Sequence, residues 1–252
     1  MATVAWRALP VLTLTVRQFL GGKAVRVVIG LSLIPVVFAI IYLLDPSVDR
    51  PRLFLGNTIF AEMMVPTLLP LIILVLATSA FGDEIEDRTL PYLTLKPMAR
   101  FRIVIEKLIG SVMISGPILI GGIAISYLLV MRGDWDQEQN LRLLGAMAAA
   151  SAVATLAYSS IFMLVSLLIS RALVAALIYS FVWETILGRF VPGLRYVSIR
   201  HFVRSIFSAV ADDRRFTFSN SASLTAAVAT LLIASAIAIA LSTWRLRSMS
   251  LE

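Results

Sequence analysis

The chain has 252 residues, of which 59% are hydrophobic and only 15% are charged, with a formal net charge of +7. A typical soluble domain is about 45–50% apolar and about 25% charged, so this composition excludes an ordinary soluble protein and indicates an integral membrane protein. The basic residues are scattered beside apolar runs and form no patch with interleaved aromatic residues, which indicates anionic lipid headgroups as partners rather than nucleic acid. Cysteine is absent and His201 is the only histidine, which excludes disulfides and argues against a histidine-based metal site.

Residues 1–24 place apolar side chains near helical spacing, with arginines and a lysine between them. This pattern predicts an amphipathic helix that lies on the membrane surface and that Pro10 kinks. The alternative is a charged segment that only leads into the first span. No small-residue cleavage site follows, so a cleaved signal peptide is not predicted.

Six apolar runs, each near the ~20-residue length of a bilayer span, follow along the chain. They cover residues 25–44, 63–80, 108–131, 143–169, 172–188 and 222–244. The sequence therefore predicts an all-α polytopic membrane protein with a single transmembrane domain over residues 1–252. In the fourth run, Gly145 and Ala149, and likewise Ala146, Ala150 and Ala154, are spaced four residues apart, which either permits close helix contact or only fills apolar positions.

The segment between the second and third runs, residues 81–107, carries five acidic and five basic residues. We expect it to lie in water, because charged side chains are costly in hydrocarbon. Its acids come first, where the N-terminus of a short helix would favour them. Apolar residues at helical spacing then give that helix, over residues 83–95, a contact face, and a basic helix begins near Arg100. We interpret residues 83–95 as a docking helix; the alternative is a solvated loop without a partner.

Residues 189–221 carry a second amphipathic pattern. Apolar side chains recur at helical spacing from Ile199 to Val210, and the basic face opposite is formed by Arg200, His201 and Arg204. This predicts an outer helix that lies at the membrane interface or re-enters it, with its basic face paired to lipid phosphates.

The distribution of Lys and Arg predicts the orientation. The side with both termini and residues 81–107 carries 12 of these residues against 10 on the other side, or against 4 when residues 189–221 are left out. The positive-inside rule then places both termini and residues 81–107 in the cytosol. Glu184, late in the fifth run, is an intramembrane acid that either lines a pathway or carries a proton, or else forms a structural pair with a neighbouring residue.

The sequence offers no catalytic constellation. The nearest approach to a phosphate-binding G-x-x-x-x-G-K-[ST] motif is Gly21-Gly22-Lys23-Ala24, which lacks both the spacing and the hydroxyl. No G-x-S-x-G signal accompanies His201, and Glu62 and Glu184 are too few acids to hold a metal. We therefore predict that the chain is not an enzyme and holds no cofactor or metal itself.

The central segment resembles that of the membrane subunits of type-2 ABC transporters. The positions that carry the resemblance are Glu84, Glu86, Thr89-Leu90, Leu93, Pro97, Arg100 and Lys107. Arg88 stands where many members of the family have glycine, which is a departure from the pattern. Six spans, an N-terminal surface helix and an outer insertion between spans five and six are also similar to that family.

The resemblance implies a permease subunit that pairs with a second copy, as a homodimer, in a bacterial or archaeal cell membrane. Two copies of a separate ATPase subunit, which bind ATP and magnesium, would dock on a cytosolic coupling helix. The docking residues that it implies are Asp83, Glu84, Ile85, Glu86, Arg88, Thr89, Leu90 and Leu93. The expected function is export of a hydrophobic or amphipathic substrate such as a lipid, a glycoconjugate or a drug. The alternative is a non-transporting partner that transmits ATPase motion to another envelope protein.

Overall fold

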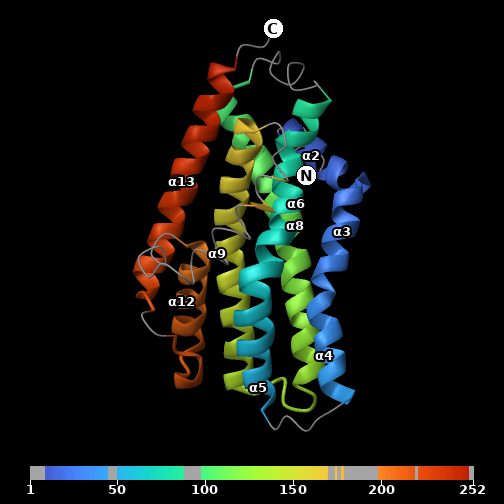
Figure 1. The fold of residues 1–252 in the computed structure, drawn as a ribbon, viewed down its shortest axis with the longest axis vertical. Coiled ribbons are helices and arrows are strands. Elements are labelled where there is room, and N and C mark those ends of the chain that lie inside the picture. Colours follow the sequence, from blue (N-terminus) through green and yellow to red (C-terminus); the bar gives the residue numbers. More distant parts are fainter. Residues whose placement is uncertain are drawn as a thin grey trace, which may run out of the picture.

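The computed structural model describes residues 9–44, 50–87, 98–169, 174, 177, 178, 198–218 and 221–249. These ranges contain helices and no strand, which confirms the predicted all-α class for the described part of the chain. The long helices run side by side along the long axis of the molecule (Figure 1). We call its two ends the α2 end, at the top of Figure 1, and the α12 end, at the bottom, after helices α2 (Pro10–Gly21) and α12 (Ile199–Ala211).

Five helical stretches in the described ranges are long and apolar enough to cross a membrane. They are Lys23–Leu44, Pro51–Gly82, Arg100–Val130, Glu138–Leu168 and Leu224–Ser248. This is compatible with an integral membrane protein and accounts for five of the six predicted runs. The remaining run, residues 172–188 with Glu184, lies outside the described residues apart from positions 174, 177 and 178.

The stretches are built from the following elements. The first consists of α3 (Lys23–Ser32) and α4 (Ile34–Leu44), and the second of α5 (Pro51–Leu53), the π-helix η1 (Phe54–Leu68) and α6 (Leu69–Glu86). The others are α8 (Arg100–Val130), α9 (Glu138–Leu168) and α13 (Leu224–Ser248), which follows the short helix η4 (Arg214–Phe216). Helix α9 is central, because it contacts α6, α8, α12 and α13.

One of the two rows of small residues on α9, the row of Ala146, Ala150 and Ala154, forms a packing face. Ala146, Ala150 and Ala154 are fully buried, which confirms the prediction of close helix contact for this row. Gly145 and Ala149 are exposed, so the second row of small residues does not belong to that face.

The outer helices of the bundle leave apolar side chains uncovered. In Figure 1, α3 and α4 lie on one side of the molecule and α13 on the other. Ile41 on α4 is 55% exposed and Ile233 on α13 is 59% exposed. Exposed apolar faces of this extent match a helix that contacts lipid or a partner helix rather than water.

The second stretch begins earlier than predicted. The apolar run predicts a span over residues 63–80, but the helix begins at Pro51. Glu62 is exposed, whereas Leu55, Ile59 and Phe60 are buried on the other side of the same helix. A single exposed acid on a helix with a buried face therefore does not mark the end of that helix.

Helix α2 lies within the segment where the sequence predicts an N-terminal helix, and it corrects the role of Pro10. Proline is the first residue of the helix, where its missing N–H is not needed, so it begins the helix rather than kinking it. Val11, Thr15 and Phe19 are buried, and α2 packs against α8. The contact is close: a Cβ added at Gly110 would lie 3.0 Å from Cγ2 of Thr15.

Helix α12 lies where the second amphipathic pattern predicts a helix, and its apolar face is covered by protein. It lies alongside the lower half of α9 in Figure 1 and contacts α9, α13 and η1. Phe207 packs within an aromatic cluster in tilted ring contacts, and its ring centroid lies 4.7 Å from that of Phe60 and 5.4 Å from that of Phe216. On the opposite face, Ser205 is also buried and accepts a hydrogen bond from the N–H of Ala222 at 3.1 Å.

Arg204 of α12 compensates for a proline in η1. The π-type bonding of η1 joins each carbonyl to an N–H five residues later, as for Met64 and Leu69. The carbonyl of Ala61 would then require an N–H from residue 66, which is Pro66 and has none. Nε of Arg204 lies 3.1 Å from this oxygen, and a second guanidinium nitrogen also donates to it. Arg204 was expected on an outward basic face, and it is instead directed to a carbonyl of the neighbouring helix.

Candidate functional site

Ionisable side chains are buried at the α2 end, where α6 ends and α8 begins. These are Glu84, Glu106 and Lys107, and we call them, together with the exposed Arg102 that pairs with Glu106, the buried charge cluster. Residues 88–97, which connect α6 to α8 in the sequence, lie outside the described residues. The cluster therefore lies beside the last described turn of α6 and the first turns of α8.

Lys107 of α8 pairs with Glu84 of α6. Its Nζ lies 2.7 Å from Oε1 of Glu84, donates also to the carbonyl of Ala80 and lies 4.8 Å from the ring centroid of Phe81. Lys107 is 0% exposed and Glu84 is 8% exposed. A buried ammonium is stable only when its donors have partners, and these three contacts supply them.

Glu106 binds the N-terminus of α2. Its Oε2 accepts from the N–H groups of Val11 at 2.9 Å and Leu12 at 3.0 Å, and its Oε1 accepts from Nε of Arg102 at 2.6 Å. The first N–H groups of a helix lack intrahelical partners, and Leu9 at the N-cap provides no side-chain acceptor. A carboxylate from a distant helix takes that role and also suits the positive end of the helix dipole.

Two consecutive residues thus link α8 to two different neighbours. Successive side chains on an α-helix are rotated by about 100°, so Glu106 reaches α2 while Lys107 reaches α6. Removing one partner of a buried ion pair typically costs about 3–5 kcal/mol. The cluster therefore holds α2, α6 and α8 together at the point where the connecting segment begins and ends.

This arrangement is suited to a mechanical role. The described residues contain no group of three metal-ligating side chains, and the charges of the cluster are committed to helix contacts. A displacement of the connecting segment would be passed to α6 and α8 together, and through Glu106 to α2.

The structure corrects two expectations for the central segment. Asp83, Glu84 and Glu86 belong to the last turns of α6 instead of opening a new helix. The pairing of Glu84 with Lys107 offsets the unfavourable position of an acid at a helix C-terminus. The expectation that the whole segment lies in water is also wrong, because Glu84, Glu106 and Lys107 are buried.

The other predicted docking residues are only partly described. Ile85 is half-buried and packs against the core. Arg88, Thr89, Leu90 and Leu93 lie outside the described residues, so the docking helix stays a prediction. Of the predicted outer basic face, Arg200 and His201 are half-buried, and the His201 ring packs edge-on against Phe202 at 5.3 Å.

Sequence reasoning missed the roles of Glu106 and Lys107, although signals were present. Arg102 and Glu106 are four residues apart on one helix, which is the spacing of an ion pair. Glu84 and Lys107 have opposite charges, and each lies beside an apolar run at the same end of two consecutive helices. An intramembrane or juxtamembrane acid beside such a lysine predicts a pair.

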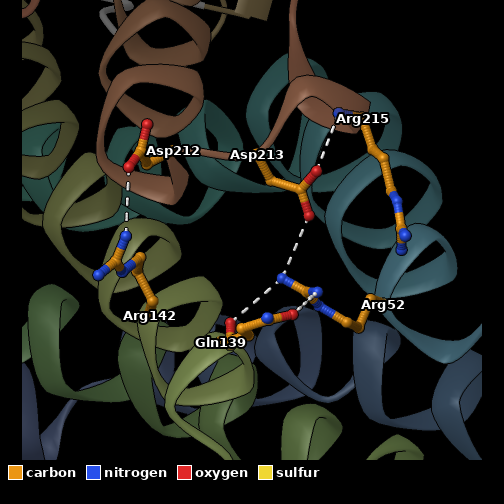
Figure 2. A network of polar contacts seen from close by, with 6 residues as sticks. All are labelled: Arg52, Gln139, Arg142, Asp212, Asp213 and Arg215. Carbon is orange, nitrogen blue, oxygen red and sulfur yellow. Dashed lines mark hydrogen bonds and ion pairs between the residues drawn. The ribbon is translucent and has the colours of Figure 1, made fainter.

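A second polar network, also missed, lies at the α12 end (Figure 2). Arg52 donates from Nη1 to Oε1 of Gln139 at 2.8 Å, and its Nη2 lies 3.2 Å from Oδ2 of Asp213. Arg142 of α9 pairs with Asp212 at 3.2 Å. The network joins α5 and α9 to the turn that follows α12.

The backbone of that turn is fixed locally. Asp212 ends α12 with φ +49°, a left-handed conformation that asparagine and aspartate tolerate better than other side chains. Oδ1 of Asp213 accepts from the N–H of Arg215 at 3.0 Å and so begins η4. Both acids therefore shape the turn as well as pairing with arginines.

Comparisons with known proteins add no constraint to this geometry. A scan against protein-family models finds no match, and a search of curated proteins also finds none.

Proposed function

We propose that the chain is the membrane subunit of a type-2 ABC exporter, in which a separate ATPase subunit drives movement of a hydrophobic or amphipathic substrate. In this proposal two copies of the chain form the membrane part, and two ATPase subunits bind ATP and magnesium. The proposal rests on the resemblance of residues 84–107 and on the compatibility of the helices with a membrane protein.

The observation that carries the proposal is the buried charge cluster, which lies at the end of α6 and the beginning of α8, the two helices that flank residues 88–97 in the sequence. A subunit that is driven by an external ATPase must convert a push on an exposed segment into movement of its spans. The Glu84–Lys107 pair joins the two helices that flank this segment, and Glu106 extends the connection to α2. A solvated loop without a partner would have no need of such a connection.

The orientation can be tested first, because the chain contains no cysteine to give background labelling. Asp87, at the α2 end, and Asp136, in the turn between α8 and α9 at the other end, are both exposed. We expect a membrane-impermeant maleimide to label Asp136→Cys on intact cells and to spare Asp87→Cys until the membrane is permeabilised. Labelling of Asp87→Cys on intact cells would overturn the proposal.

Docking is tested by purifying the full chain from its native host and measuring ATP hydrolysis in the eluate. Glu84 is unsuitable for the variant, because its reversal would also break the pair with Lys107. Asp87→Lys changes an exposed acid next to the segment, and Asp136→Lys is the matched control. We expect the first variant to lose most of the co-purified ATPase activity and the second to retain it. Equal retention, or no activity with the wild-type chain, would contradict the docking role.

Transport itself is tested in proteoliposomes that contain the captured complex. ATP-dependent movement of labelled lipids or amphipathic drugs is the expected result. Capture of the ATPase without any such movement would favour the alternative, a partner that transmits ATPase motion to another envelope protein.

A further inference from the structure

The polar network at the α12 end surrounds a cavity of about 530 Å³. Four arginines line it: Arg52, Arg142, Arg214 and Arg215. They come from α5, α9 and η4, so the cavity exists only because α12 brings its following turn against the two other helices. Arginine is the side chain best suited to bind phosphate, because its planar fork presents several donors at once.

The acids that line the cavity are committed to two of these arginines. Asp213 pairs with Arg52 at 3.2 Å, and Arg142 pairs both with Asp212 at 3.2 Å and with Glu138 at 3.3 Å. The lining therefore has four basic and three acidic side chains, with a formal surplus of one positive charge.

Arg214 and Arg215 carry this surplus. Both are exposed, and no acid of the described ranges lies within ion-pair distance of either guanidinium. The backbone of Arg215 is held in place, because its N–H donates to Oδ1 of Asp213. In Figure 2 the Arg215 side chain extends along the side of the network that Arg52 occupies. Because the lining holds more basic than acidic side chains, its potential favours a bound anion.

We propose that this cavity binds a phosphate group, held mainly by Arg214 and Arg215 and completed by Arg52. The phosphate could belong to the headgroup of an anionic phospholipid or to a soluble phosphate compound, and the chemistry of recognition is the same for both. The proposal does not rest on the exporter function, since it concerns the chain alone.

The test uses the full chain in phosphatidylcholine nanodiscs. Inorganic pyrophosphate is titrated by calorimetry, and a parallel arm measures by native mass spectrometry how much phosphatidylglycerol the protein retains from mixed micelles. The variant is Arg214→Gln/Arg215→Gln. The matched control is Arg50→Gln/Arg132→Gln, which removes two exposed charges at the same end but outside the cavity lining.

We expect the control to bind like the wild type and the cavity variant to bind at least about tenfold more weakly, because charge-assisted hydrogen bonds are lost. Selective loss of pyrophosphate binding would identify a soluble ligand, and selective loss of phosphatidylglycerol would identify a lipid headgroup. Arg214→Lys/Arg215→Lys, which keeps the charge but not the fork, is expected to fall between the two. Binding by the cavity variant equal to that of the control in both arms, or no binding by the wild type in either arm, would overturn the proposal.

Discussion

Breaking the Glu84–Lys107 pair provides the sharpest test of the buried charge cluster. Lys107→Met leaves a buried carboxylate without its cation, and Glu84→Gln replaces the anionic partner of a fully buried ammonium by a neutral acceptor. Because the two side chains are 0% and 10% exposed, solvent cannot replace the lost partner, and each variant should lose about 3–5 kcal/mol of stability. The double variant removes both charges, so it should lose no more stability than either single variant, which corresponds to a coupling energy of at least about 3 kcal/mol.

The measurement is equilibrium unfolding of the full chain in mixed micelles, followed by the helical circular dichroism signal. The exposed pair of Glu138 and Arg142, which lie four residues apart on α9, is the control, and its coupling energy should be about 0.5 kcal/mol or less. If the Glu84–Lys107 coupling were as small as that of the control, the cluster would not hold α6 to α8. The mechanical role assigned to it would then have no basis.

Three further predictions follow from other contacts. Gly122→Ala should destabilise the protein by about 1–3 kcal/mol in the same unfolding assay, because its Cβ would lie 2.5 Å from a backbone oxygen of α3. Gly121→Ala is the control, and it should be neutral or slightly stabilising because the space around it is open. Equal effects of the two substitutions would contradict the close approach of α3 to α8 at Gly122. Arg204→Met should destabilise the wild-type chain but much less a Pro66→Ala chain, in which an N–H is restored to η1, so additive effects would refute the compensation. Raising salt to 1 M should speed hydrogen exchange in the turn after α12 while leaving the first turn of α2 unchanged, and a uniform response would refute this difference between the ends.

The helices could be predicted from the sequence because apolar runs and helical periodicity are local properties of the chain. Apolar runs of span length predict the five stretches that the structure describes, and the period of α12 predicts its buried face down to Phe202 and Phe207. The same period does not tell whether lipid or protein covers that face, because both are apolar. For this reason α12 was expected at the membrane interface, whereas its aromatic residues pack against η1 and η4.

The contacts of the two polar sites could not be predicted in the same way, because they depend on residues that are distant in the sequence. Glu106 caps a helix that begins 96 residues earlier, and the proline that Arg204 compensates lies on a different helix. Charge patterning did identify the correct region around residues 81–107. It placed the acids at the N-terminus of a helix, whereas they lie at the C-terminus of α6. Their position depends on the ion pair between Glu84 and Lys107, which the local pattern of charges does not reveal.

The two ends of the bundle differ in the strength of their ionic contacts, and this difference bears on how the molecule would move. At the α2 end, the pair of Glu84 and Lys107 is shielded from water, so separating its partners would cost several kcal/mol. At the α12 end, the side chains of the Arg142 pairs are 48–88% exposed, and such pairs contribute about 0–1 kcal/mol each. A force applied at the α2 end would therefore move α2, α6 and α8 as one unit before it separated them. The exposed Arg142 pairs would separate at a smaller cost than the Glu84–Lys107 pair, whereas the Arg52–Asp213 pair, with side chains 19% and 18% exposed, is the contact that retains the turn after α12.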